Sequence, residues 1–593
     1  MREEKVPSWV QDAIDDAQKP EDWQRLSERY QDSLEIASTE AAEQRPRFIA
    51  RKLGGVYYTP EPLVQRLVED TIGHILASAR QKVAVYQGES GQLTDVIHQV
   101  RSLRVLDPAC GVGSFLVAAC ERLCQFYQWL NHETKGLMVD PAEAFGQVVG
   151  VEIDPVAAEI CRQRIVDLGS SIGCDTVRVE IICADALRCG RLPDANIILT
   201  NPPFEVLTNF ASNPKAADTA KWVRSSHQYP LSSRGQINLY RLFLERCAAH
   251  LPSGGSLGII LPLSFMGDLQ SAKLRRYLLT ETRLESVTMI SEHSRAFSSA
   301  AQGVAVLVAR KGETTKRVTV EQLASLRSDS TATQRSLLDI EVIKALSPDL
   351  WVLPHCHPGL VPTLQRMSRY PKLKDCGGST GLAEVLVGEL DQTIHRHYIS
   401  DKPTEMMLVR GEHMGERYYV SLEASGKARF VDPAFLQRCA SATKRAHLVN
   451  QRLIFQGIAN LGLVRRLRFA LCPAGVVLGN SVNYLALYGS EEEQIYYYLG
   501  LLNSQLMNWR YCITSYGNNI SNYEIGQLPI ITYDQAGSEA REVAMIARQL
   551  TDLARTSQFQ TAAAKELDQR MDRLIYRIYD INRAEQELIE SGG

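Results

Sequence analysis

An asparagine, two prolines and a phenylalanine, Asn201-Pro202-Pro203-Phe204, end a short apolar run at residues 196–200. Because proline lacks an N–H and fixes φ, the chain has to leave a β-sheet here, with Asn201 at the rim. The Asn201 side-chain carbonyl and the Pro202 backbone carbonyl can both accept hydrogen bonds from an exocyclic amine. The Phe204 ring offers a face on which a base can stack. The spacing favours a base-binding site, although Asn-Pro-Pro is also an ordinary turn.

Three earlier apolar runs of strand length end in an acidic side chain, at Asp107, Glu152 and Asp185. Runs of this length that alternate with helical patterns are typical of a doubly wound sheet with parallel strands. Parallel strands bring their carboxyl ends to one edge of the sheet. We therefore expect the three acids and Asn201 to line that edge.

The first of these runs continues into a turn of small residues, Asp107-Pro108-Ala109-Cys110-Gly111-Val112-Gly113, and then into a helix predicted at 114–130. Glycines in such a turn let the backbone approach a ligand where a side chain would collide. The Asp107 carboxylate can meet the cationic amino end of a ligand. The sequence predicts a small-molecule site at this turn.

Taken together, these motifs resemble those of N6-adenine DNA methyltransferases, whose amine-binding motif is Asn-Pro-Pro-aromatic. A Gly-Gly-Val-Tyr-Tyr-Thr-Pro segment at 54–60 precedes the glycine turn, which is the motif order of the family's γ class. The resemblance is specific between residues 54 and 311. It implies a Rossmann-like α/β domain that binds S-adenosylmethionine rather than a nicotinamide dinucleotide.

The family's site residues carry over to named positions of this chain. In the catalytic motif Asn201-Pro202-Pro203-Phe204, Asn201 and Pro202 would bind the target amine and Phe204 would stack on the flipped adenine. Phe297 would pack against the same base. The implied cofactor ligands are Thr59, Asp107, Ala109, Gly111, Gly113, Glu152, Ile153, Asp185, Ala186 and Asn201. No metal site is implied.

Length and composition indicate a chain of several domains, with 593 residues of which 45% are hydrophobic and 22% charged. No apolar run approaches the roughly 20 residues of a membrane span, and the N-terminus lacks a signal-peptide pattern. Thirteen cysteines without a Cys-x-x-Cys pair argue against a zinc ribbon or a disulfide framework. We expect a cytoplasmic protein with reduced thiols and no membrane partner.

Changes in composition divide the chain into five segments. From residue 312 the sequence turns polar, with a Ser/Thr-rich run at 325–333, and short strand-like runs follow. We expect a helical lead-in at 1–50, the catalytic domain at 51–312, a linker at 313–345, a mixed α+β target-recognition domain at 346–535 and helices at 536–593.

A local excess of basic residues lies in the predicted recognition domain, although the formal net charge of the chain is −3. Between residues 427 and 468 there are nine Lys/Arg residues and a single acidic residue, Asp432. Such an excess favours contact with phosphates of double-stranded DNA. The candidate DNA ligands are Arg410, Lys444, Arg445, Arg452, Arg465, Arg466 and Arg468. A long polar loop expected at 205–234 is a second candidate.

The function predicted is methylation of adenine N6 in a restriction-modification or phage-defence system. A lead-in of fifty residues is too short for a nuclease, so cutting would fall to a separate endonuclease or another subunit. One alternative is a methyltransferase of RNA, of protein glutamine or of cytosine N4, since related enzymes use similar motifs. The other alternative is a DNA-binding scaffold without catalysis.

Overall fold

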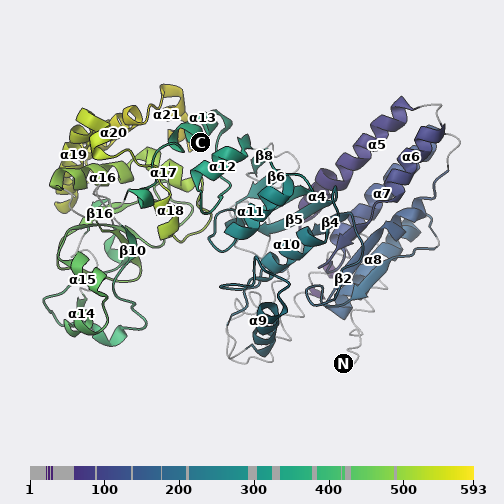
Figure 1. Cartoon of the computed structure of the whole chain (residues 1–593), viewed down its shortest axis with the longest axis horizontal. Coiled ribbons are helices and arrows are strands. Elements are labelled where there is room, and N and C mark those ends of the chain that lie inside the picture. The colour runs from purple at the N-terminus through teal and green to yellow at the C-terminus, as the bar shows by residue number, and fades with distance from the viewer. Residues whose placement is uncertain are drawn as a thin grey trace. The chain divides into compact units, whose positions relative to one another are not determined.

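The computed structural model describes residues 22, 25–26, 29–30, 59–86, 90–134, 138–174, 176–208, 213–291, 303–323, 334–376, 384–415, 417–420, 429–486 and 491–592 (Figure 1). The chain forms two compact units, Met1–Ile340 and Glu341–Gly593. In these ranges no helix combines the length and the apolar character needed to cross a bilayer.

A nine-stranded sheet in the order β3-β2-β1-β4-β5-β7-β6-β8-β9 forms the centre of the first unit. Its strands are β1 (Val105–Asp107), β2 (Val148–Glu152), β3 (Glu180–Cys183), β4 (Ile197–Thr200), β5 (Ser256–Pro262), β6 (Thr282–Ile290), β7 (Val304–Lys311), β8 (Arg317–Leu323) and β9 (Gln334–Asp339). The strands from β3 to β5 pair in parallel, and β7 runs antiparallel to β5. This order confirms the predicted doubly wound α/β fold.

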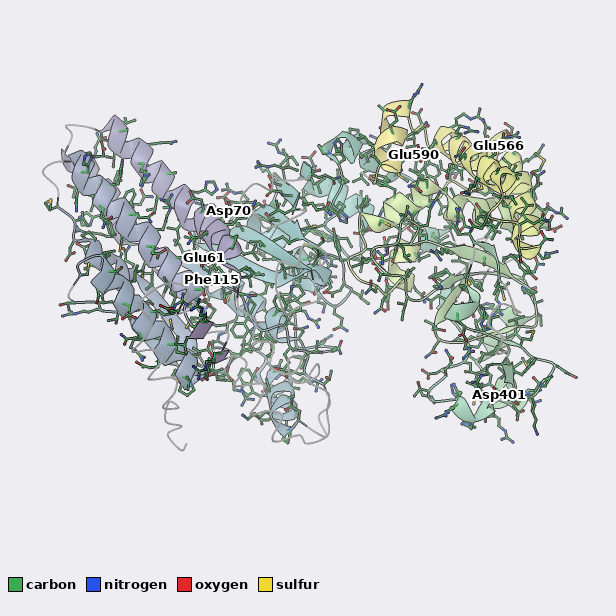
Figure 2. The ribbon with its side chains drawn as sticks, turned by 180° about the vertical axis from the view of Figure 1, so that it is seen from behind. Glu61, Asp70, Phe115, Asp401, Glu566 and Glu590 are labelled. Atoms are coloured by element: carbon green, nitrogen blue, oxygen red, sulfur yellow. The ribbon has the colours of Figure 1, made fainter. Side chains whose placement is uncertain are left out.

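Helices precede and connect the strands, and several of them pack on the two faces of the sheet (Figure 1). They are α4 (Glu61–Val68), α5 (His74–Val85), α6 (Ser90–Arg101), α7 (Ser114–Thr134), α8 (Pro155–Ser171), α9 (Pro214–Ser226), α10 (Leu239–His250) and α11 (Ala272–Glu281). A π-helical turn, Glu69–Gly73, joins α4 to α5. Figure 2 shows the side chains of this unit, with Glu61 at the start of α4 and Phe115 near the start of α7.

Strands β8 and β9 lie inside residues 313–345, where the sequence predicts a linker. Along β8 the apolar residues Val318, Val320 and Leu323 are buried, while the intervening residues are more exposed. Polar residues stand between the buried apolar ones, so the strand has a half-polar sequence, which explains the misleading composition. The Ser/Thr-rich run at 325–333 lies outside the described residues.

The second unit is a mixed α+β structure. Its main sheet has the order β10-β18-β15-β16-β13, from β10 (Val385–Val387), β13 (Tyr418–Tyr419), β15 (Arg452–Gln456), β16 (Phe469–Cys472) and β18 (Val482–Leu485). Two strand pairs stand beside it: β11 (Ile399–Ser400) with β14 (Phe430–Val431), and β12 (Leu408–Val409) with β17 (Val477–Leu478).

Helices make up the rest of the second unit. They are α12 (Ile340–Leu346), α13 (Val361–Met367), α14 (Ala434–Arg438), α15 (Ala442–Leu448), α16 (Glu492–Asn503), α17 (Gln505–Cys512), α18 (Asn522–Gly526), α19 (Tyr533–Arg555), α20 (Ala562–Ile578) and α21 (Arg583–Glu590). The last three correspond to the predicted C-terminal helices. They share one core with α16 and α17, to which Leu501, Val543 and Leu574 contribute.

A buried ion pair joins two parts of the second unit. Glu389 and Arg452 have side chains with 0% and 1% exposure, and Arg452 Nη1 donates to Glu389 Oε1. The other carboxylate oxygen of Glu389 accepts from the Leu478 amide at 2.7 Å. The Arg452 guanidinium also lies 5.0 Å from the centre of the Tyr484 ring. The pair thus ties β15 to β17.

Replacing Glu389 with alanine should destabilise this region strongly, because the Arg452 charge would stay buried without its partner. We expect the free energy of opening of β15 to fall by about 3–5 kcal/mol. Hydrogen exchange of the β15 amides measures it. Glu587→Ala, which breaks the exposed pair with Arg583, should change it by less than about 0.5 kcal/mol. Equal effects of the two variants would contradict the assignment.

Candidate active site

A cavity of about 540 Å³ lies at the carboxyl edge of the parallel strands in the first unit. The chain leaves β1, β2, β3 and β4 into its walls, and the starts of α7, α8, α9 and α10 also contribute to them. Predicted site residues that line it are Thr59, Asp107, Ala109, Gly111, Glu152, Ile153, Asp185, Ala186, Asn201 and Pro203. The fold therefore brings together side chains that are distant in the chain, such as Thr59 and Asn201, which are 142 positions apart.

Asp107, at the end of β1, is a buried carboxyl at the floor of the cavity. Its side chain has 1% exposure, and its Oδ1 accepts from the Ala109 amide at 3.1 Å. Burial raises the pKa of Asp107 to about 7. A cationic ligand group would offset the cost of ionising this carboxyl, so the position suits an ammonium group.

Glu152, at the end of β2, is held by two backbone amides. Its Oε2 accepts from Gly111 at 2.8 Å and its Oε1 from Asp154 at 2.9 Å. Burial raises the pKa of Glu152. Beside it, Ile153 is 66% exposed although it is apolar. An acid with a fixed rotamer next to an uncovered apolar side chain suits a polar ring system that carries hydroxyl groups.

The two glycines of the turn have different roles. Gly111 has φ of +52° and its amide donates to Glu152, so it shapes the cavity wall. Gly113 has φ of +86°, and a Cβ there would lie 2.5 Å from the Cys161 sulfur of α8. Gly113 does not line the cavity. Its structural role is close packing of the turn on α8, which the sequence does not indicate.

Asp185, at the end of β3, is partly exposed at the cavity wall. Its Oδ1 accepts from the Leu187 amide at 2.9 Å, and its Oδ2 lies 3.6 Å from Arg188 Nε. These bonds fix the carboxylate beside Ala186. The arrangement leaves carboxylate lone pairs available for an amine donor.

The side-chain amide of Asn201 indicates what kind of ligand the cavity binds. Its Nδ2 donates to Thr59 Oγ1 at 2.9 Å. Its Oδ1 is buried and has no partner in the part of the chain that the structure describes. A buried acceptor without a donor is costly, which indicates that a ligand donor belongs there.

Other residues of the motif stand around Asn201. Pro203 lines the cavity, whereas Pro202 and Phe204 are not among its lining residues. The Phe204 ring is half-buried and meets the Tyr240 ring edge-on, with 6.1 Å between centroids. Phe297 lies outside the described residues.

The cavity wall also contains residues outside the predicted set, among them Tyr30, Glu205 and Lys215. The Tyr30 hydroxyl donates to Asp154 Oδ2 at 2.7 Å, and the ring is 6% exposed. Leu26 and Tyr30 are both buried, and their i, i+4 spacing was the available signal. Glu205, whose pKa burial raises, and Lys215 also line the cavity.

Lys215 lies in a segment that the sequence predicts to be a polar loop, residues 205–234. That part of the prediction is wrong, because the segment contains α9 (Pro214–Ser226). Asn213 caps this helix by accepting from the Ala216 amide at 3.0 Å, and Pro214 occupies its first turn.

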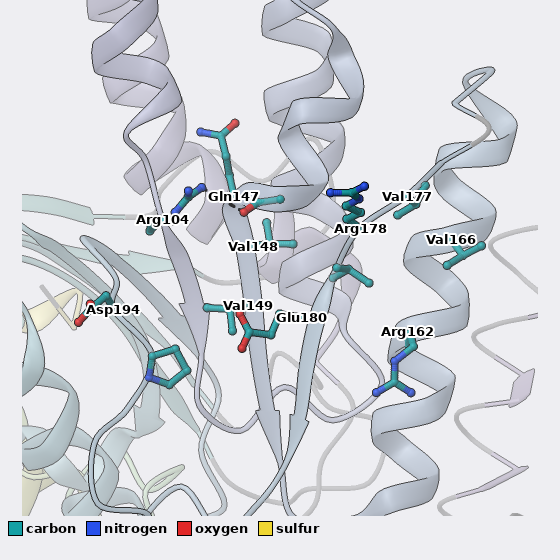
Figure 3. Close-up of a pocket in the computed structure, with 13 residues that line it drawn as sticks. Arg104, Gln147, Val148, Val149, Arg162, Val166, Val177, Arg178, Glu180 and Asp194 are labelled. Carbon is teal, nitrogen blue, oxygen red and sulfur yellow. Dashed lines mark hydrogen bonds between the residues drawn. The ribbon is translucent and has the colours of Figure 1, made fainter.

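A second pocket of about 640 Å³ opens at the opposite edge of the same sheet (Figure 3). Arg104, Val148 and Glu180 in its wall stand at or before the first residues of their strands. None of the predicted site residues lines it. Ligands of doubly wound sheets bind at carboxyl ends, so the cavity at Asn201 is the candidate active site. Among the described residues no three His, Cys, Asp or Glu side chains are grouped as a metal site.

Two of the predicted DNA ligands are internal structural residues, which corrects the prediction. Arg452 is 0% exposed and pairs with Glu389. Arg466 is 2% exposed, donates to the Gly517 carbonyl at 2.5 Å and lies over the Tyr511 ring. A buried guanidinium that satisfies internal acceptors cannot reach a phosphate.

The other five basic candidates are at least partly accessible. Arg410 pairs with Glu412, and Arg465 lies 3.1 Å from Asp572. Lys444 and Arg445 on α15 donate to the carbonyls of Gly388 and Leu436, and Arg468 to that of Arg465. Within the residues that the structure describes, Lys444, Arg445 and Arg468 are the members of this set that form no ion pair with an acidic side chain.

Asp107→Asn should stabilise the folded protein above pH 7, because the isosteric amide needs no ionisation in the cavity. Protonation of the buried Asp107 carboxyl stabilises the wild type below about pH 4, and this contribution is lost as pH rises through about 7. We expect a gain on the order of 2 kcal/mol at pH 8 that vanishes at low pH. Urea unfolding at several pH values measures it. Asp194→Asn, at an exposed pair with Arg191, is the control, and a pH-independent gain would argue against the assignment.

Known proteins resemble the chain in sequence and in fold. The sequence model of the N-6 DNA Methylase family matches residues 48–346. The type II methyltransferase M.TthHB8I of Thermus thermophilus is 28% identical over 183 residues, which are 31% of this chain and 34% of that protein. The type II methyltransferase M.BanIII of Aneurinibacillus aneurinilyticus is 24% identical over 240 residues, 39% of this chain and 34% of that protein. The matches thus span about a third of the length of these curated relatives.

A solved structure of a restriction-modification enzyme has a similar fold over nearly the whole chain. The type IIL restriction-modification enzyme MmeI, in complex with DNA, aligns with a TM-score of 0.57 at 14% identity. The alignment covers 92% of this chain and 80% of that chain. The shared fold therefore includes the second unit as well as the sheet with the cavity.

Proposed function

We propose that this chain, which belongs to the N-6 DNA methylase family, is a site-specific DNA methyltransferase acting on N6 of adenine. The observation that carries the proposal is the buried, unpaired Oδ1 of Asn201 in a cavity lined by strand-end acids. An acceptor without a partner suits a ligand that brings N–H donors. The exocyclic amine of adenine is such a ligand.

The cavity fits S-adenosylmethionine as methyl donor. Asp107 would bind the ammonium group, Glu152 the ribose hydroxyls and Asp185 the adenine amine, with Ile153 packed on the adenine ring. Tyr30 would close the wall beside Asp154. When bound, the cofactor supplies an electrophilic methyl group on a sulfonium. The chain's own residues supply orientation and exclude water.

The Asn201 side-chain carbonyl and the Pro202 backbone carbonyl would activate the target amine by accepting hydrogen bonds from its two N–H groups. With both hydrogens held, the nitrogen lone pair is drawn out of conjugation with the ring and becomes available as a nucleophile. Phe204, braced edge-on by Tyr240, would stack on the flipped base. This scheme needs no covalent intermediate with the protein.

Residues of the second unit would hold the DNA backbone. Lys444, Arg445 and Arg468 are accessible and suit phosphate contact. The relatives are type II methyltransferases, and MmeI is a restriction-modification enzyme in complex with DNA. We infer a role in restriction-modification for this chain, with duplex DNA as partner and with a separate endonuclease or defence subunit for cleavage.

The decisive experiment is methyl transfer from labelled S-adenosylmethionine to unmethylated genomic DNA, followed by nucleoside analysis and modified-base sequencing. We expect N6-methyladenine in one sequence motif. Label on RNA or protein instead would identify a different substrate class. DNA binding with no methylation of any substrate would favour a scaffold.

Asn201→Ala should remove the amine acceptor without disturbing the duplex contacts. We expect the single-turnover rate to fall by at least about 100-fold, as for loss of one preorganised catalytic hydrogen bond. DNA affinity should stay within about threefold, which gel retardation measures. Arg191→Ala, at an exposed ion pair away from the cavity, is the matched control. A rate change below tenfold would exclude Asn201 from catalysis.

Cofactor binding should weaken in acid because Asp107 has to be ionised to bind an ammonium group. With a pKa of about 7, the dissociation constant should fall by about tenfold between pH 6 and pH 7.5. Isothermal titration calorimetry measures it. In Asp107→Asn, binding should be weaker and nearly independent of pH over this range, and an unchanged pH profile would place the titrating group elsewhere.

A further inference from the structure

Two open hydrogen-bonding groups face the cavity and are joined to each other. Thr59 lines the cavity with 7% exposure, and its Oγ1 accepts from Asn201 Nδ2 at 2.9 Å. A threonine hydroxyl also has a proton to donate. Within the described ranges that O–H has no acceptor. The second open group is the unpaired Oδ1 of Asn201.

The single bond between them does not fix the Asn201 amide by itself. An amide has two orientations of nearly equal shape, and a hydroxyl can either accept from its NH₂ or donate to its oxygen. Only the first orientation turns Oδ1 toward an incoming amine. The second would set the amide N–H groups against the amine N–H groups, which is repulsive.

An anionic acceptor for the Thr59 hydroxyl would remove this ambiguity. Once the O–H donates to an anion, only the Oγ1 lone pairs remain for Asn201, so Asn201 must present its NH₂ to Thr59. Its Oδ1 then faces the substrate. Acidic residues outnumber basic residues in the cavity wall. Lys215 is the basic residue there, and the acidic residues are Asp107, Glu152, Asp154, Asp185 and Glu205. A ligand carboxylate therefore has few charged partners, and the unused Thr59 hydroxyl is a suitable neutral donor.

We propose that Thr59 is a positioning residue that couples the carboxylate of the cofactor to the orientation of Asn201. The target adenine is then bound tightly only after the cofactor carboxylate is in place. The inference rests on the proposed function, and it adds an order of binding that the catalytic motif alone does not imply.

The test measures binding without turnover. Fluorescence anisotropy gives the affinity for a labelled duplex that carries the motif found by modified-base sequencing. One duplex has adenine at the target, and a matched duplex has purine, which lacks the exocyclic amine. Each is titrated alone, with sinefungin, which keeps the amino-acid carboxylate, and with 5′-methylthioadenosine, which lacks it.

In the wild type, sinefungin should tighten binding of the adenine duplex by about tenfold, a typical coupling between two sites. It should change purine-duplex binding by less than about twofold, and methylthioadenosine should tighten neither duplex. Thr59→Val, which keeps the side-chain shape without the hydroxyl, should abolish the tenfold effect. Thr59→Ser should retain it. Unfolding curves of both variants check that the fold is intact.

Three results would overturn the proposal. Equal tightening by methylthioadenosine and sinefungin would show that the carboxylate has no part. Tightening that persists in Thr59→Val, or that is equal for the purine duplex, would show that the coupling bypasses Thr59 or the amine. If the wild-type protein gives one of these three results but still methylates DNA, the proposed function stands and only the role of Thr59 is overturned. A wild type that binds neither sinefungin nor DNA would overturn both.

Discussion

The site depends on the parallel pairing of β1 with strands on both of its sides. Val105 stands opposite Val148 of β2 and opposite Ile197 of β4, so three strands end at nearly the same level. The chain reverses its direction of winding between β1 and β4, which opens a crevice above their carboxyl ends. The polar groups at the strand ends, Asp107, Glu152 and Asn201, are brought to the cavity by that geometry. A shift in register would separate Asp107 from Asn201 even if both side chains were kept.

That geometry concentrates acids at one edge of the sheet. Asp107 is buried under the glycine turn, and the carboxylate of Glu152 relies on two backbone amides. Such an arrangement opposes folding at neutral pH and is retained where a cationic ligand is to be bound, as is common at functional sites. The unpaired Oδ1 of Asn201 belongs to the same pattern. The free protein keeps an unfavourable local state that a ligand can relieve.

The sequence predicted the parts of the fold that follow local rules. An apolar run of strand length that ends in a polar side chain is a local pattern, and so the strand ends with Asp107, Glu152, Asp185 and Asn201 were found. The failures needed distant information. Arg452 looks like a surface charge until Glu389 is placed beside it, 63 residues earlier in the chain. Tyr30 looks like one apolar residue of a helix until its hydroxyl meets Asp154, 124 residues later.

The shared core of the second unit also has a consequence for engineering. Helices α19 to α21 pack on α16 and α17 as one cluster, in which Leu501, Val543 and Leu574 are fully or almost fully buried. A chimera that exchanged residues 346–535 alone would cut through this cluster and leave apolar surface on both fragments. An exchange of this part of the chain should therefore transfer the whole unit Glu341–Gly593.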